Sequence, residues 1–241
     1  MPHKYKHFLS FTSISSIFGA ITTAFLFLWA SAAPPDFESQ LKLADNPWYM
    51  GKLWILFFHP QFNFLAVIGI AIIRLRETPG LVISSVLFLL IWMITEMSQQ
   101  AFLIDALNQM WRPAYVQADT ELKRNIYETL IRGASGFSDS KYFVLLYAFG
   151  LGSLLLGLSL LRDTGLAKWI GSIQMFIGIL SLSSFVRYYF YFSSLDPIVN
   201  WLYEWIYVFI QPFVRLLIAY WLFSQIKKLN YKDESAHDYQ A

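Results

Sequence analysis

Residues 82–94 read VISSVLFLLIWMI, an uncharged run inside an apolar stretch that covers 81–104. As a helix, a stretch of this length crosses the ~30 Å of hydrocarbon in a bilayer. Apolar and polar residues do not alternate in it, so it lacks the pattern of a membrane β-barrel strand. Because backbone groups in hydrocarbon must be hydrogen-bonded within the segment, the stretch predicts a membrane-spanning α-helix.

The rest of the chain has the same character. Of its 241 residues, 56% are hydrophobic and only 14% are charged, against roughly 25% charged in a soluble domain. Several apolar runs of about 20 residues cannot all be hidden in one soluble core. The sequence therefore predicts an all-α, polytopic integral membrane bundle of about six transmembrane helices. The spans are expected near 9–32, 52–73, 81–104, 142–161, 169–193 and 199–224.

Several classes of chemistry are excluded by the residues that are missing. The chain has no cysteine, which rules out disulfides, thiolate metal sites and thiol catalysis. A net charge of only +2 and the lack of any RNA- or DNA-reading motif argue against nucleic-acid binding. The sequence contains no HExxH, P-loop or GxSxG motif. His59 is the only histidine in a span, so a haem held there would need Met93 or Met97 as its second ligand. We therefore predict no cofactor and no metal, and do not favour an enzyme.

The long connection over 108–141 predicts an amphipathic helix outside the membrane. Asp119 is expected to cap its first turn and Gly133 to end it. Its apolar residues recur at helical spacing, at Leu122, Ile126 and Leu130. Because one face is apolar, we expect this helix to lie on the surface of the membrane or of the bundle.

Lysine and arginine positions predict the orientation in the cell membrane. Nine lie on the side of the N-terminus, mostly in short loops and at helix ends: Lys4, Lys6, Arg74, Arg76, Arg162, Lys168, Lys227, Lys228 and Lys232. Seven lie on the other side, five of them in the long connection: Lys42, Lys52, Arg112, Lys123, Arg124, Arg132 and Lys141. Charge in short loops counts most, so both termini are predicted to be cytoplasmic. The transmembrane domain then covers 1–229, and a polar, disordered cytoplasmic tail covers 230–241.

The first span has an alternative interpretation as a signal peptide. Lys4 and Lys6 precede an apolar stretch that ends in Ala30-Ser31-Ala32, which resembles a cleavage site. The stretch is long for a signal sequence, however, and it carries small residues at helix-packing intervals, such as Ser15 with Gly19. We therefore favour a retained first helix.

Polar residues within the spans are the candidate functional residues, because an ionisable group in hydrocarbon is costly unless it is paired or solvated. Counting 1.5 Å per residue places four of them about 9–12 Å below the outer helix ends, namely His59, Glu96, Arg187 and Glu204. The predicted cluster consists of His59, Glu96, Gln100, Arg187 and Glu204. Glu204, Gln211 and Arg215 follow i, i+7, i+11 spacing and are expected on one helix face, with Arg215 near mid-membrane. Pro60 and Pro212 predict helix irregularities beside this cluster.

Structural roles compete with a functional role at each of these positions. Glu96 and Arg187 are compatible with an ion pair that serves only the fold, and His59 with a hydrogen-bonded packing residue. Arg187 and Glu204 can also extend to the outer interface. The tyrosines and tryptophans near 188–205 are typical of a membrane aromatic belt. Glycines in the fourth and fifth spans, including Gly150, Gly157, Gly171 and Gly178, predict close helix packing.

Three functions are compatible with this pattern. The favoured one is binding or transport of a small solute or proton through a polar pocket in the outer half of the bundle. A non-catalytic scaffold or complex subunit is the first alternative, with the polar residues holding helices together. An intramembrane hydrolase or lipid-modifying enzyme that uses Glu96 or Glu204 with His59 is the second. The expected partners are membrane lipids and a small solute.

Overall fold

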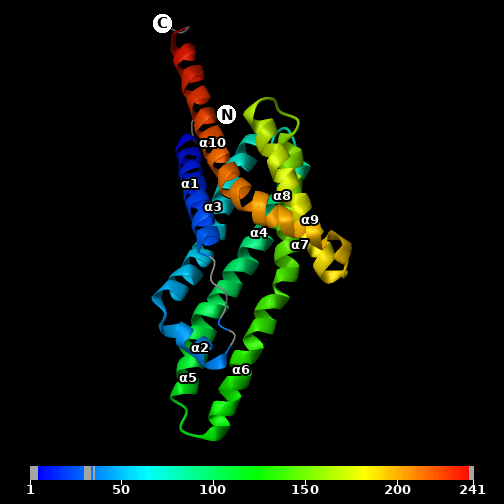
Figure 1. The fold of residues 1–241 in the computed structure, drawn as a ribbon. Helices are drawn as coiled ribbons and strands as arrows, with labels where there is room; N and C mark the ends of the chain where they lie inside the picture. Colours follow the sequence, from blue (N-terminus) through cyan, green and yellow to red (C-terminus); the bar gives the residue numbers. More distant parts are fainter. Residues whose placement is uncertain (1–4, 30–33, 35, 239–241) are drawn as a thin grey trace.

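The computed structural model describes residues 5–29, 34 and 36–238, and all regular structure in these residues is helical (Figure 1). Six helices are long and apolar enough to cross a membrane. This confirms the all-α membrane bundle. The proposed cleavage sequence at 30–32 lies outside the described residues, as do residues 239–241.

The helices follow the predicted spans closely. Those that build the bundle are α1 (Lys6–Leu28), α3 (Pro47–Arg74), α4 (Pro79–Phe102), α7 (Tyr142–Leu160), α8 (Leu166–Tyr189) and α10 (Val208–Asp238). The connecting elements are α2 (Phe37–Leu41), η2 (Lys42–Asp45), η3 (Leu103–Trp111), α5 (Arg112–Val116), α6 (Glu121–Ser140), η4 (Ser193–Leu195), α9 (Asp196–Leu202) and η5 (Tyr203–Tyr207). Two of them, η3 and η5, are π-helical. Helix α10 continues to Asp238, so the predicted disordered tail is helical over 230–238.

The six bundle helices form a ring in the order α1, α3, α4, α7, α8, α10, with α10 closing against α1. Helix α1 begins and α10 ends at one end of the bundle, which we call the terminal side; α5 and α6 project from the opposite end, the hairpin side (Figure 1). Helix α1 packs along both α3 and α10. The first span is therefore an integral part of the bundle.

Glycine contacts hold α7 and α8 together, as the sequence predicts. A Cβ atom added at Gly178 would lie 2.6 Å from the backbone nitrogen of Leu154, and one at Gly171 would lie 2.9 Å from the carbonyl oxygen of Gly157. Backbone atoms cannot move aside as a flexible side chain can. These glycines therefore set the distance between the two helices.

The predicted amphipathic helix exists as α6, but its ends and its position differ from the prediction. Thr120 has extended backbone angles and its side chain accepts a hydrogen bond from the Lys123 amide, so Thr120 and not Asp119 is the N-cap. Gly133 lies within the helix, which ends at Ser140. Lys141 keeps helical angles, so α6 continues almost straight into α7 and projects from the bundle instead of lying on its surface (Figure 1).

A small second core stabilises this projection. Leu41 of α2, Leu107 of η3, and Ile131 and Ala134 of α6 are buried against one another. The stripe that the sequence analysis singled out is exposed instead, with Leu122 72% and Ile126 50% accessible. The buried face of α6 is thus a different one from the face that the i, i+4 spacing predicted.

Candidate functional site

The candidate site is a cavity of about 380 Å³, called here the central cavity, in the half of the bundle nearest the hairpin side. All six bundle helices and η5 contribute to its wall. Its polar lining residues are Thr23, Lys52, His59, Glu96, Gln99, Gln100, Tyr142, Ser181, Tyr203, Tyr207, Gln211 and Arg215. Leucines, Phe27, Trp92 and Phe149 form the apolar part. A volume of this size is typical of small-molecule sites.

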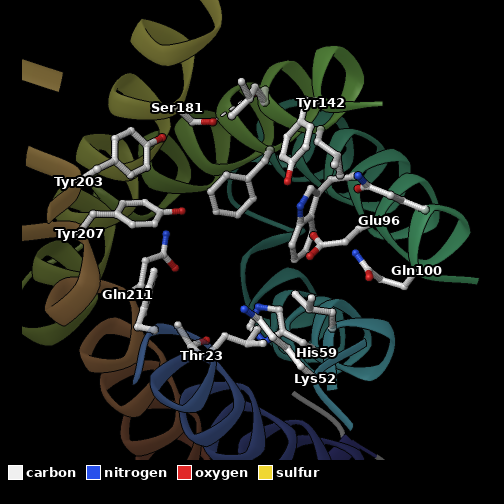
Figure 2. A pocket seen from close by; sticks show the side chains of 18 of the residues that line it. Thr23, Lys52, His59, Glu96, Gln100, Tyr142, Ser181, Tyr203, Tyr207 and Gln211 are labelled. Atoms are coloured by element: carbon white, nitrogen blue, oxygen red, sulfur yellow. Dashed lines mark hydrogen bonds between the residues drawn. The ribbon is translucent and has the colours of Figure 1, made fainter. Parts of the chain in front are cut away.

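Three of the five predicted site residues line this cavity. They are His59 from α3 and Glu96 and Gln100 from α4 (Figure 2). Gln100 is 6% exposed and Glu96 is half-buried at the cavity wall. Because the two residues of α4 are separated by one helical turn, they project in the same direction, as expected.

Arg187 and Glu204, the other two residues of the predicted cluster, are not among the residues that line the central cavity. Arg187 lies near the end of α8, where it donates a 2.5 Å hydrogen bond to Asn200 Oδ1 and lies 3.5 Å from an Asp196 carboxylate oxygen. Glu204 is exposed. It lies within the π-helical segment η5, whose wider turn disrupts the i, i+7, i+11 relation to Gln211 and Arg215 that an α-helix would give. Its side chain is therefore rotated away from the cavity.

A chain of hydrogen bonds across α1, α3 and α10 holds one wall of the cavity. Arg215 Nε donates to Asn63 Oδ1 at 2.5 Å, and Arg215 Nη1 donates to the Gln211 carbonyl oxygen at 2.8 Å and to Gln211 Oε1. Asn63 Nδ2 in turn lies 2.9 Å from His59 Nε2, and His59 Nδ1 lies 2.9 Å from Thr22 Oγ1. Ser16 Oγ donates to the Arg215 carbonyl oxygen at 2.7 Å.

These contacts assign the protonation state of His59. An arginine only donates, so the Asn63 atom that faces it must be the oxygen, and the Asn63 amide nitrogen must face the imidazole. Nε2 therefore accepts, and the ring proton sits on Nδ1, pointing to Thr22. Thr22 Oγ1 can accept it because its own hydrogen is directed to the Phe18 carbonyl oxygen at 2.8 Å. His59 is thus a neutral, fully engaged packing residue, which argues against its use as a catalytic base beside Glu96.

Other polar groups at the cavity have no partner. Among the described residues, Gln100 Oε1 and Gln211 Nε2 are buried without a hydrogen bond. Glu96 has no ion-pair partner within 4.0 Å in the same part of the chain. Buried polar atoms are normally satisfied, and each exception calls for an explanation.

The cavity is closed toward the terminal side. Beyond Arg215 lies a small void of about 40 Å³, lined by apolar residues such as Leu89 and Leu156 and by the polar residues Asn63, Ser153 and Gln174. Close-packed side chains follow, with Leu9, Ile70 and Leu222 all 0% exposed. At the far end Arg74, 2% exposed, bonds Asp163 at 2.7 Å and the Ser159 carbonyl oxygen at 2.8 Å. In this conformation a layer of buried apolar side chains thus lies between the central cavity and the terminal side.

A second pocket, of about 350 Å³, adjoins the central cavity between α7, α8 and η5. It shares Tyr142, Leu146 and Tyr203 with the central cavity and also includes Arg187. Tyr142 is 48% exposed. The two tyrosines thus lie between the central cavity and the surroundings of the bundle.

Several cavity residues lie outside the predicted cluster, although Gln211 and Arg215 were already expected on one polar helix face. Gln211 and Arg215 stand one turn apart beside Pro212, which removes a backbone N–H from α10. Tyr203 and Tyr207 belong to η5 and turn inward, whereas the sequence analysis grouped Tyr203 with the aromatic belt (Figure 2). Within the described residues there is no group of three or more histidine and acidic side chains arranged to hold a metal ion.

Comparisons with protein-family models, with curated proteins and with solved structures find no match for this chain. The fold defines a multi-pass α-helical membrane protein.

Proposed function

We propose that this protein binds a small polar or amphipathic solute in the central cavity, from the hairpin side of the membrane. The observation that carries the proposal is a pair of buried amide atoms without a hydrogen bond on the cavity wall, Gln100 Oε1 and Gln211 Nε2, beside the carboxylate of Glu96. Leaving such groups unsatisfied costs about 1–3 kcal/mol each. A bound solute that pairs with them would offset this cost.

The predicted orientation places the hairpin side outside the cell, so the solute would come from the outer surface. Tyr142 and Tyr203 line both the second pocket and the central cavity, so a movement of these two side chains would join the two spaces. Transport would require the close-packed terminal half to open, and binding requires no such change. Binding is therefore the function that this conformation supports best.

The test is a screen of neutral, anionic, cationic and zwitterionic small solutes against the purified protein. Because the chain has no cysteine, Leu146→Cys introduces a unique thiol on the cavity wall. A bound solute is expected to raise the Tm and to slow the reaction of this thiol with a small thiol reagent. If no solute of any class does either, the proposal is wrong.

Glu96→Gln and Glu204→Gln form a matched pair, because both remove one carboxylate and only Glu96 lines the cavity. We expect Glu96→Gln to weaken the binding of any solute that pairs with the carboxylate at least tenfold, and Glu204→Gln to leave it unchanged. A properly folded Glu96→Gln protein with unchanged binding of every solute would remove Glu96 from the site.

A further inference from the structure

Unfilled hydrogen-bond donors gather on the α10 side of the central cavity. Arg215 uses Nε and Nη1 within the protein, and its Nη2 has no partner among the described residues. Gln211 Nε2 lies one turn away, and Gln211 is 2% exposed. A guanidinium with a neighbouring amide N–H is suited to a carboxylate, which accepts several hydrogen bonds at once.

Unfilled acceptors gather on the α4 side. Glu96 and the buried Gln100 Oε1 are adjacent on one helix face. Figure 2 shows Glu96 and Gln100 across the cavity from Tyr207 and Gln211. A carboxylate with an amide oxygen beside it is suited to an ammonium group, which only donates.

Glu96 and Arg215 lie on the same cavity and yet do not pair with each other, since no contact within 4.0 Å joins them among the described residues. The third charged residue of the lining, Lys52, already donates to the Trp29 carbonyl oxygen at 2.9 Å. Leu56, Leu145 and Phe149 line the same cavity. A solute with a single charge would leave either Glu96 or Arg215 without a counter-charge in a largely apolar setting, which is costly. A solute with both charges leaves neither uncompensated.

We propose that the ligand of the central cavity is a small zwitterion of the amino-acid class, with its carboxylate on Arg215 and Gln211 and its ammonium on Glu96 and Gln100. This inference rests on the proposed function and specifies its solute. The apolar wall between the two polar ends accommodates the side chain or carbon skeleton of the zwitterion.

The experiment compares glycine, leucine and phenylalanine, each with the amine that lacks its carboxylate and the acid that lacks its ammonium. Binding is measured by calorimetry and by protection of the Leu146→Cys thiol. We expect at least one of the three zwitterions to bind ten or more times more tightly than both of its single-charge analogues. Equal binding of a zwitterion and either analogue, or no binding of any zwitterion, would overturn the proposal.

Two near-isosteric substitutions then test which end binds which charge. Glu96→Gln is expected to weaken the zwitterion and the amine at least tenfold and to spare the acid. Gln211→Glu keeps the oxygen that accepts from Arg215 but replaces the free donor with an anionic oxygen, so it is expected to weaken the zwitterion and the acid and to spare the amine. Equal losses for all three probes in both variants would contradict the assignment.

Failure of this inference is distinguishable from failure of the proposed function. If neutral or singly charged solutes protect the Leu146→Cys thiol while the zwitterions do not, the cavity is a binding site for another class. If nothing protects the thiol, both proposals are wrong. The ligand-free Tm of each variant, with Glu204→Gln as reference, shows whether a loss of binding reflects a loss of folding.

Discussion

At the residue scale, Asn63 connects a buried guanidinium, that of Arg215, with a buried imidazole, that of His59. Its amide oxygen accepts from Arg215 and its amide nitrogen donates to His59. Asn63 is 8% exposed, so water cannot easily take over either role. The network therefore depends on the one side chain that both accepts and donates at this point.

We expect Asn63→Leu to destabilise the protein by about 3 kcal/mol, because it leaves a buried guanidinium N–H and an imidazole nitrogen unpaired. The measurement is the shift in Tm of the purified protein. Thr22→Val is the control, since it removes a half-buried hydroxyl from the end of the same network and is expected to cost less. An Asn63→Leu protein as stable as the wild type would show that the network does not hold the helices together.

Gly178 offers a second test at this scale. We expect Gly178→Ala to destabilise the protein by about 1–3 kcal/mol, because the added methyl would meet the Leu154 backbone and force α7 and α8 apart. Gly133→Ala is the matched control. An added Cβ at Gly133 meets nothing within 4 Å, and alanine favours a helix over glycine by about 1 kcal/mol. Opposite signs of the two Tm shifts are expected, and equal shifts would contradict close packing at Gly178.

At the element scale, the end of a helix depends on backbone geometry that residue type alone does not specify. Asp119 and Thr120 are both good N-cap residues, and Thr120 caps α6 because it is the one with extended angles, φ −128° and ψ 149°. Asp119 instead contacts Lys123 at 2.8 Å on the surface. The sequence predicts that a helix starts here, but the choice between neighbouring cap residues depends on the preceding turn.

We expect Thr120→Ala to destabilise α6 by about 1 kcal/mol and Asp119→Ala to have a smaller effect, because exposed ion pairs contribute little. Amide hydrogen exchange over the first turn of α6 measures both. Faster exchange in Asp119→Ala than in Thr120→Ala would contradict the assignment of the cap.

The same limit explains why Glu204 does not line the central cavity. Apolar composition predicts the span, and an ideal α-helix then fixes which residues share a face. The π-helical turn over Tyr203–Tyr207 changes that phase. The spacing of polar and apolar residues along the sequence does not indicate a single π-helical turn, although Pro212 indicates an irregularity nearby. Residues after the turn, Gln211 and Arg215, reach the cavity, and Glu204 within it does not.

At the scale of the whole molecule, the number of spans could be predicted because hydrocarbon thickness imposes a minimum apolar length on each. The order of the helices around the ring could not, since any helix of this composition can pack against any other. His59, Glu96 and Gln100 were found because a polar group in a span needs a polar environment. Their meeting with Arg215 and Gln211 depends on the order of the helices in the ring and on the rotation of each helix. The same holds for Arg187, which remains near the end of α8 with Asn200.

The claim on which the other proposals depend is that the central cavity is open to the hairpin side and closed to the terminal side. The test uses three single-cysteine variants: Lys123→Cys in the hairpin, Leu146→Cys on the cavity wall, and Ser159→Cys in the terminal half, where Ser159 is 0% exposed. Each variant, in sealed right-side-out membranes, is treated with a small charged thiol reagent that does not cross the bilayer. We expect Lys123→Cys and Leu146→Cys to react, and Ser159→Cys to react only after denaturation. Reaction of Ser159→Cys in the native protein, or protection of Leu146→Cys while Lys123→Cys is labelled, would contradict an outward-open cavity.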